Sequence, residues 1–222
     1  MACLVARALQ DGETVGVGVN SPIPACGVLL AQRTHAPRLR FRLPGVEGTV
    51  PFQGSKEFFD FAQRGRLDVF FLSGVQIDAH ANINLHVLGE YERPRRRFPG
   101  AFGSAVLYPV VRRVILFRTE HTPRAFVPHV DFVSASGSPD RVITPLAVLG
   151  YDRRTRRLEL DSYHPGQSIE RVQAATGFQL PVRPTVHQTR PPSPRELAVL
   201  REQVYPALAD VYPRFVRGLT RA

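Results

Sequence analysis

A polar segment that directly follows an apolar run is the first place in this sequence where we expect chemistry. Val69–Leu72 is apolar without alternation, which is typical of a strand buried on both faces. The run stops at Ser73, and Gly74–Asp78 follows it. In open α/β sheets ligands bind at the carboxyl ends of strands, and a glycine there allows a tight turn or a close approach. Gly74–Asp78 is therefore a candidate binding segment, and an ordinary exit from a strand is the alternative.

The other reactive residue types form no recognised cluster. Histidines are scattered without the spacing of metal ligands, at His80, His86, His121, His129 and His164. The two cysteines, Cys3 and Cys26, do not form a metal-type pair, and we expect free thiols in a reducing compartment. The sequence contains no phosphate-binding loop, dinucleotide fingerprint or nucleophile elbow. We therefore predict no metal site.

Length and hydropathy favour a single globular domain. The chain has 222 residues, 43% of them hydrophobic, which suits one domain spanning residues 1–222 with its own core. No apolar run approaches the roughly 18 residues that would span a bilayer. The amino-terminal residues do not have the pattern of a signal peptide. We therefore expect a cytoplasmic protein without a membrane partner.

Strands alternate with helices along the chain. Helices are expected at residues 2–10, 25–34, 104–108, 168–175 and 193–204, and one more is expected to be capped by Ser55 and to end at Gly65. Strands are expected at residues 14–19, 39–43, 69–72, 85–89, 114–117 and 158–160, with a single one inside 141–151. Residues 181–192 are proline-rich and expected to be extended over the surface. This order predicts an α/β fold with an open, mainly parallel sheet and helices on both faces.

Several short motifs, in order, resemble one family. The chain is similar to the β subunits of class I coenzyme A (CoA) transferases of the glutaconate type. The segments that carry the resemblance are Gly74–Asp78 with Asn82–Asn84, Arg97–Gly100, Phe126–Val133, Val142–Leu149, His164–Gly166 and Ala175–Phe178. They extend over nearly the whole chain, and their shared order makes the resemblance specific. It implies the open α/β fold of CoA-transferase subunits.

The resemblance also implies an activity and a partner. Such a protein would be the β subunit of a heterodimer or heterotetramer that contains a CoA-transferase α subunit. It would transfer CoA between an acyl-CoA and a carboxylic acid, with the CoA thioester as substrate and no permanently bound cofactor. The family's nucleophile is a glutamate placed after an Ala-Pro pair and a strand. Here Ala36-Pro37 and the strand lead to Leu43-Pro44 instead, and the nearest carboxylate is Glu47. Glu47 is therefore the candidate nucleophile.

Two glycine-containing segments are the implied binding elements. The first supplies Gly74, Val75 and Gln76. The second supplies Gly100, Phe102 and Gly103, where the transferases carry a Gly-x-Gly-Gly motif. Glycines in such loops let backbone amides approach a thioester and stabilise the oxyanion. Phe102 replaces one of these glycines, so the backbone is less free at that point.

The missing family glutamate leaves two other functions open. The chain resembles relatives without that glutamate, among them hydrolases that open rings of CoA-linked substrates and a decarboxylase. In a protein of this kind the catalytic carboxylate would lie on the α subunit. A third possibility is a scaffold that takes no part in catalysis and only completes the partner's pocket. A nucleophilic carboxylate near residue 47 would distinguish the first function from the other two.

The net charge of +10 is carried almost entirely by arginine, because Lys56 is the only lysine. A dense cluster lies at Arg93–Arg97. Its proline argues against a recognition helix, and no nucleic-acid-binding motif accompanies it, so we expect no nucleic-acid partner. Arginine suits the phosphates of CoA, since its planar guanidinium makes bidentate contacts. A solvated loop or a contact with an acidic partner subunit is the alternative.

Overall fold

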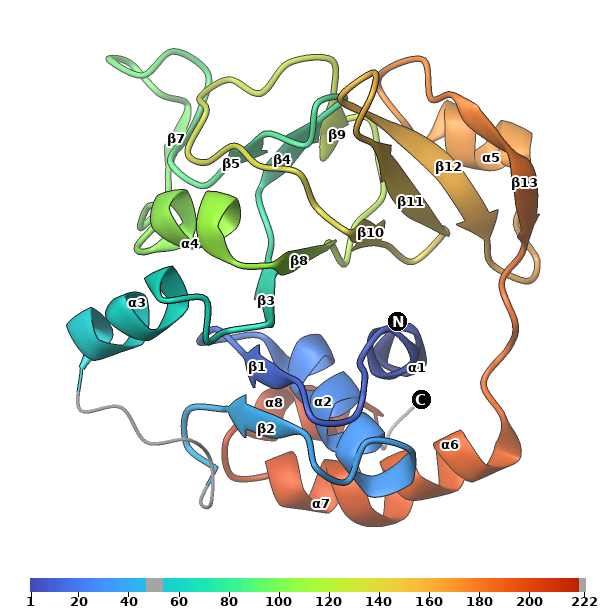
Figure 1. The fold of residues 1–222 in the computed structure, drawn as a ribbon. Coiled ribbons are helices and arrows are strands. Elements are labelled where there is room, and N and C mark those ends of the chain that lie inside the picture. Colours follow the sequence, from blue (N-terminus) through green and yellow to red (C-terminus); the bar gives the residue numbers. More distant parts are fainter. Residues whose placement is uncertain (47–53, 220–222) are drawn as a thin grey trace. The chain divides into compact units, whose positions relative to one another are not determined.

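The structure is a computed structural model that describes residues 1–46 and 54–219 (Figure 1). The chain forms two compact units. The first consists of residues 1–71 and 192–222, and the second of residues 72–191. Among the described residues, no helix has the length and apolar character needed to cross a membrane.

Three parallel strands belong to the first unit, and the third of them ends one residue beyond it. They are β1 (Thr14–Gly16), β2 (Arg40–Arg42) and β3 (Val69–Leu72). β1 lies in the middle and pairs in parallel with both neighbours. All four residues of β3 are buried, as expected for an apolar run without alternation. The predicted strand at residues 69–72 is confirmed.

The helices of the first unit come from both ends of the chain. They are α1 (Ala2–Arg7), α2 (Pro22–Thr34), α3 (Ser55–Gln63), α6 (Pro194–Val199), the π-helical turn η1 (Leu200–Val204), α7 (Tyr205–Leu208) and α8 (Pro213–Leu219). Arg7 donates two hydrogen bonds to Glu196, of 2.7 and 2.6 Å. This ion pair holds the pKa of Glu196 down, to about 2. It ties the first helix to the returning carboxyl-terminal segment.

The second unit contains a row of five paired strands. Its strands are β8 (Arg113–Phe117), β10 (Arg141–Ile143), β11 (Ala147–Asp152), β12 (Arg157–Tyr163) and β13 (Val182–Gln188), with β10 between β8 and β11. The pairs β8–β10 and β12–β13 are parallel, whereas β10–β11 and β11–β12 are antiparallel. The parallel pairs outnumber the antiparallel ones over both units, and the predicted α/β fold is confirmed.

Smaller elements complete the second unit. β4 (Gln76–Asp78) pairs with β5 (Ile83–Asn84) and β9 (Phe126–Val127), while β6 (Val87–Leu88) and β7 (Arg96–Arg97) form a hairpin. The helices are α4 (Ser104–Val110) and α5 (Ile169–Ala174). These small strands follow β3 and position the candidate site.

Two strand expectations are corrected. Residues 141–151 contain two antiparallel strands, because the hydroxyl of Thr144 accepts hydrogen bonds from the amides of Leu146 and Ala147 and closes a turn between them. Residues 182–188, expected to be extended over the surface, instead pair with β12 as β13. Proline at position 184 is tolerated because β13 is an edge strand.

Helix boundaries also differ in places. The N-cap of α3 is Gly54, and Ser55 is the first helical residue. Pro109 lies inside the short helix α4 instead of ending it. Pro206 lies in the first turn of α7, directly after the π-helical turn η1, so it does not end the helical segment as expected. The capping box at Ser193 and Glu196 is present as predicted, with the Glu196 amide donating to the Ser193 hydroxyl.

Candidate functional site

Gly74 packs against its own chain at the start of the candidate segment. A Cβ atom at Gly74 would lie 2.7 Å from the carbonyl oxygen of Gln76 and 3.1 Å from that of Asn84. Backbone atoms cannot move aside as a flexible side chain can. The group that approaches this glycine closely is therefore the neighbouring β4–β5 backbone. The glycine is required for the fold of the segment.

Gln76 is a buried organising side chain. Its Oε1 accepts hydrogen bonds from Nδ2 of Asn84 at 2.7 Å and from the amide of Asp131 at 3.0 Å. Only 5% of Gln76 and none of Asn84 is exposed. Burial of these polar groups is tolerable because each is hydrogen bonded. Gln76 therefore joins β4, β5 and the segment around Asp131.

Val75 is half-buried, and its amide is used within the fold. The amide of Val75 donates to the carbonyl of Asn84 at 2.8 Å. A donor that already has a strong backbone acceptor does not stabilise an oxyanion at the same time. Any contact of Val75 with a substrate would therefore involve its side chain or its carbonyl oxygen.

His86 joins the two glycine-containing segments. The amide of His86 donates to Oδ1 of Asn84 at 3.0 Å, and its Nδ1 is hydrogen bonded to the hydroxyl of Ser134 at 2.6 Å. A Cβ atom at Gly100 would lie 3.3 Å from Nε2 of His86. A chain of contacts thus runs from Gln76 through Asn84 and His86 to Gly100. The structure brings the two predicted segments together.

The loop from Gly100 to Gly103 has an unusual backbone. Gly100 has a φ of +99°, and Phe102 has a φ of +44°, which is rare for a residue with a side chain. The Phe102 side chain is 86% exposed. Gly103 is buried and forms the N-cap of α4. The position where the sequence departs from the family glycine therefore presents an aromatic ring to solvent.

The remaining catalytic prediction, Glu47, lies outside the described residues. The strand that leads toward it, β2, is described and ends at Arg42. Leu43, which stands near the family's glutamate position, is 1% exposed. A buried leucine is a core residue, so Leu43 contributes to packing.

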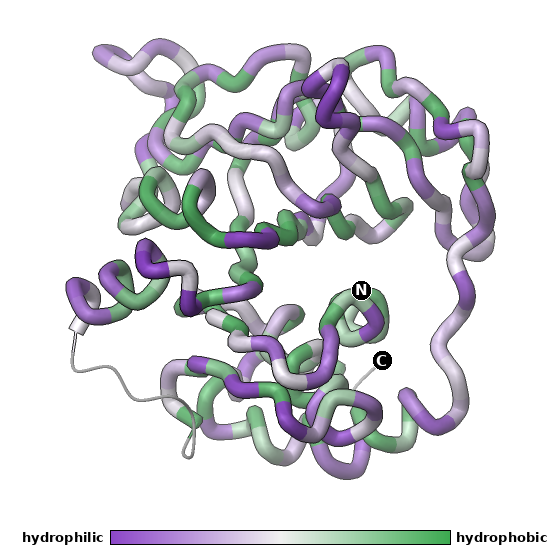
Figure 2. The backbone as a smooth tube through the Cα atoms, viewed as in Figure 1, coloured by the Kyte–Doolittle hydropathy of each residue, from purple (hydrophilic) through white to green (hydrophobic). Residues whose placement is uncertain are grey.

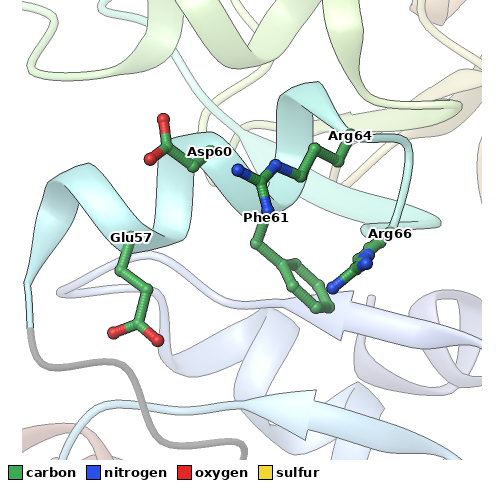
Figure 3. Close-up of a pocket in the computed structure, with 5 residues that line it drawn as sticks. All are labelled: Glu57, Asp60, Phe61, Arg64 and Arg66. Atoms are coloured by element: carbon green, nitrogen blue, oxygen red, sulfur yellow. The ribbon is translucent and has the colours of Figure 1, made fainter.

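A small pocket lies in the first unit, on α3 and the turn after it (Figure 3). Its volume is about 180 Å³, and it is lined by Glu57, Asp60, Phe61, Arg64 and Arg66. Lys56 pairs with Asp60 at 2.5 Å and lowers the pKa of that carboxyl. Sites for drug-sized ligands usually measure about 300–1,000 Å³. The pocket is too small for CoA, and none of the predicted site residues that the structure describes lines it.

His121 and His164 belong to a buried hydroxyl network. The ring of His121 is hydrogen bonded to Thr144 at 2.8 Å and to Thr176 at 3.0 Å. His164 is bonded to Thr189 at 2.9 Å and to the carbonyl of Thr144 at 2.9 Å. Burial, with a smaller effect of His164, lowers the pKa of His121 to about 4. Both rings hold strands together, and the described residues contain no cluster of potential metal ligands.

Comparison with known proteins identifies related chains. A family model described as Coenzyme A transferase matches residues 45–175. The chain is 25% identical to the B subunit of glutaconate CoA-transferase from Acidaminococcus fermentans, over 95% of this chain and 92% of the relative. It is 29% identical to the cholesterol ring-cleaving hydrolase IpdB subunit of Rhodococcus jostii, over 83% and 82%. The crystal structure of the decarboxylase AibA/AibB has a TM-score of 0.83 at 28% identity and covers 90% of this chain and 91% of that chain.

Sequence reasoning missed two members of the site. His86 is one of several scattered histidines in the sequence, and no motif there singles out Ser134. Both lie near Asn84, which the family motif does contain. The motif asparagine was the available signal, because a buried asparagine needs several partners nearby.

Proposed function

Because the chain belongs to the coenzyme A transferase family, we propose that it is the β subunit of a heteromeric enzyme that transfers CoA between an acyl-CoA and a carboxylic acid. The observation that carries this proposal is the match of the family model to residues 45–175. The similarity to the B subunit of a glutaconate CoA-transferase, over nearly the full length of both chains, supports it. The substrate is a CoA thioester, and the proposal includes no permanently bound cofactor.

The partner is a CoA-transferase α subunit, in a heterodimer or heterotetramer. The relatives support this, because one is named as a subunit of a larger enzyme and the decarboxylase AibA/AibB is named as a pair of chains. The net charge of +10 favours a partner surface of opposite charge. We place the complex in the cytoplasm and take residues 1–222 as one functional domain.

The proposed chemistry is covalent catalysis by Glu47. Its carboxylate attacks the thioester carbonyl, a C–O bond forms, the C–S bond breaks and CoA leaves as thiolate. The resulting acyl-glutamyl anhydride is attacked at the glutamyl carbonyl by that thiolate, which releases the carboxylate product and leaves a glutamyl-CoA thioester. The second acid then takes CoA by the reverse steps. Dividing the transfer in this way replaces one difficult step by easier ones.

The two glycine-containing segments contact the substrate in this proposal. Gly74, Val75 and Gln76 shape one wall, and Gly100, Phe102 and Gly103 shape another. The contacts through Asn84 and His86 support this grouping, because they hold the two segments in one region of the second unit.

A hydrolytic, ring-opening or decarboxylating CoA enzyme is the second candidate. Leu43-Pro44 stands where the family glutamate is expected, and Leu43 is buried. Relatives named as a ring-cleaving hydrolase and a decarboxylase match the chain over most of its length, as the transferase subunits do. In this case the catalytic carboxylate lies on the α subunit, and Glu47 has no catalytic role.

Intact-mass spectrometry distinguishes the two. The chain is co-expressed with its α subunit, incubated with acyl-CoA thioesters and trapped with borohydride or hydroxylamine, and each subunit is weighed. A CoA-dependent mass change on this chain, located at Glu47 and absent in Glu47→Gln, supports the transferase. Consumption of acyl-CoA without any adduct on this chain rejects Glu47 as nucleophile and supports the second candidate.

A further inference from the structure

We propose that the arginine-rich hairpin of residues 87–98, called the arm here, binds the nucleotide end of CoA. This inference rests on the proposed function, because it assigns a place to one part of that substrate. The arm consists of β6, β7 and the connection between them (Figure 1). Its tip is strongly hydrophilic (Figure 2).

The arm carries a column of stacked groups. The ring of Tyr91 stacks on Phe132, with centroids 4.9 Å apart and planes inclined by 27°. The guanidinium of Arg97 lies 5.0 Å from the centroid of Tyr91, and Nη2 of Arg97 donates to the Tyr91 carbonyl at 2.8 Å. The cation–π contact and the hydrogen bond together restrict the guanidinium of Arg97 beside the ring. Its planar face suits a further aromatic ring such as adenine.

Further positive charge lies beside this column. Arg96 is also held over a ring, 5.1 Å from the centroid of Phe98. The arm has four arginines, at positions 93, 95, 96 and 97, and two glutamates, at 90 and 92, which gives an excess of two positive charges. All four arginines are exposed. The rings beneath Arg97 and Arg96, Tyr91 and Phe98, flank the cluster in sequence, whereas Phe132, on which Tyr91 stacks, is distant along the chain.

The base of the arm is joined to the candidate site. The ring of His86 packs edge-on against Phe132, with centroids 4.9 Å apart. The same His86 lies next to Gly100, and its carbonyl accepts the amide of Phe98 at 2.8 Å. The amide of Gly89 is anchored to the carboxylate of Asp131 at 2.7 Å. The arm therefore begins where the two glycine-containing segments meet.

This arrangement fits the chemistry of CoA's nucleotide end. That end carries an adenine ring, a diphosphate and a 3′-phosphate, and so combines one flat ring with several anionic groups. Arginine binds phosphate through bidentate, charge-assisted hydrogen bonds and stacks on rings. The short arm offers one stacking platform with arginines around it, next to the proposed thioester site. An acidic protein surface would need the arginines but not the platform.

The test uses the full chain in complex with its α subunit. Steady-state kinetics are compared for an acyl-CoA and the matching acyl-pantetheine, which lacks the nucleotide. The variants are Arg96→Gln/Arg97→Gln and Tyr91→Leu. The matched control is Arg153→Gln/Arg154→Gln, which removes two exposed arginines from the β11–β12 turn. Binding of adenosine 3′,5′-bisphosphate is measured by calorimetry, because it requires no turnover.

We expect the arginine variant to raise KM for the acyl-CoA by about tenfold or more, the scale of losing one charge-assisted contact. Its kcat, and its kcat/KM for acyl-pantetheine, should stay within about twofold of the wild type. Bisphosphate affinity should fall in parallel for both arm variants, and the control should match the wild type in every measurement.

Three results would overturn the arm's role. One is an unchanged KM for acyl-CoA in both arm variants. Another is an equal loss with acyl-CoA and acyl-pantetheine. The third is dissociation of the α subunit from the arm variant in size-exclusion chromatography, which would make the arm a protein interface. The complex could also bind the bisphosphate through the arm but consume no acyl-CoA. That result would reject the proposed reaction and still support the arm as a nucleotide-binding site.

Discussion

The segment from Gly74 to Asn84 and the loop from Gly100 to Gly103 both resemble family motifs, but they are built differently. In the first, a glycine packs against backbone carbonyls, and Gln76 and Asn84 are buried and bonded to one another. In the second, Phe102 has a left-handed backbone and an exposed ring. The first segment is fixed by its own chain, and the second faces solvent.

This difference shows which motif carries information about the reaction. Gln76 and Asn84 are buried and hydrogen bonded within the fold, so a motif match at these residues indicates the fold more than the reaction. The exposed loop is where this chain departs from the transferase pattern. Substitutions in the first segment should therefore change stability most, and those in the loop should change catalysis most.

The largest effect is expected from Gly74→Val. Its Cβ would lie 2.7 Å from the carbonyl oxygen of Gln76, which belongs to a strand and cannot rotate away. We expect the free energy of unfolding to fall by about 3 kcal/mol or more, measured by urea denaturation. Gly54→Val is the control, because its backbone is extended and no atom of the described residues lies within 4 Å of its Cβ. Equal losses in the two variants would show that Gly74 is not sterically constrained.

The buried hydroxyl network predicts a pH dependence. His121 has a pKa of about 4 in the folded chain against about 6.5 when unfolded, so the unfolded state binds the extra proton first. The neutral His121 ring contributes about 3 kcal/mol to the free energy of unfolding. This contribution is present in full above pH 6.5 and is lost as the pH falls toward 4. Urea denaturation between pH 4 and 7.5 measures it. His121→Gln should flatten this slope, and an unchanged slope would assign the pH dependence to other groups.

A smaller loss is expected from Asn84→Ala. The substitution removes the Nδ2 donor to Gln76 and Val87 and the Oδ1 acceptor of the His86 amide. Unpaired buried groups cost roughly 1–3 kcal/mol, and we expect about 2 kcal/mol in urea denaturation. Ser136→Ala, which removes an exposed hydrogen bond to Asn82, should cost less than about 0.5 kcal/mol. If Asn84→Ala cost as little as Ser136→Ala, the hydrogen bonds of Asn84 would not be what stabilises this segment.

Local patterns predicted most elements, and long-range contacts account for part of the errors, while the turn at Thr144 is a local feature that was missed. The apolar run of β3 and the capping box at Ser193 were predictable, since each depends on adjacent residues. β13 was not, because its pairing with β12 joins segments far apart in sequence. Phe132 as the platform for Tyr91 was hidden for the same reason. The motif identifies the glycines of the site, whereas the place of His86 in the site is evident only from the fold.

The smallest effect on stability, and the sharpest on catalysis, is expected from Phe102→Gly. Glycine relieves the left-handed backbone, and the ring it removes is 86% exposed, so the free energy of unfolding should change by less than about 1 kcal/mol. The freed backbone can approach a thioester more closely, and CoA transfer should rise several-fold relative to hydrolysis when both products are measured by chromatography. Val106→Ala, at an exposed position of α4, changes the apolar surface without altering the loop and should leave that ratio unchanged. If both variants shift the ratio equally, or neither does, the loop does not set the reaction, and the distinction between the two segments fails.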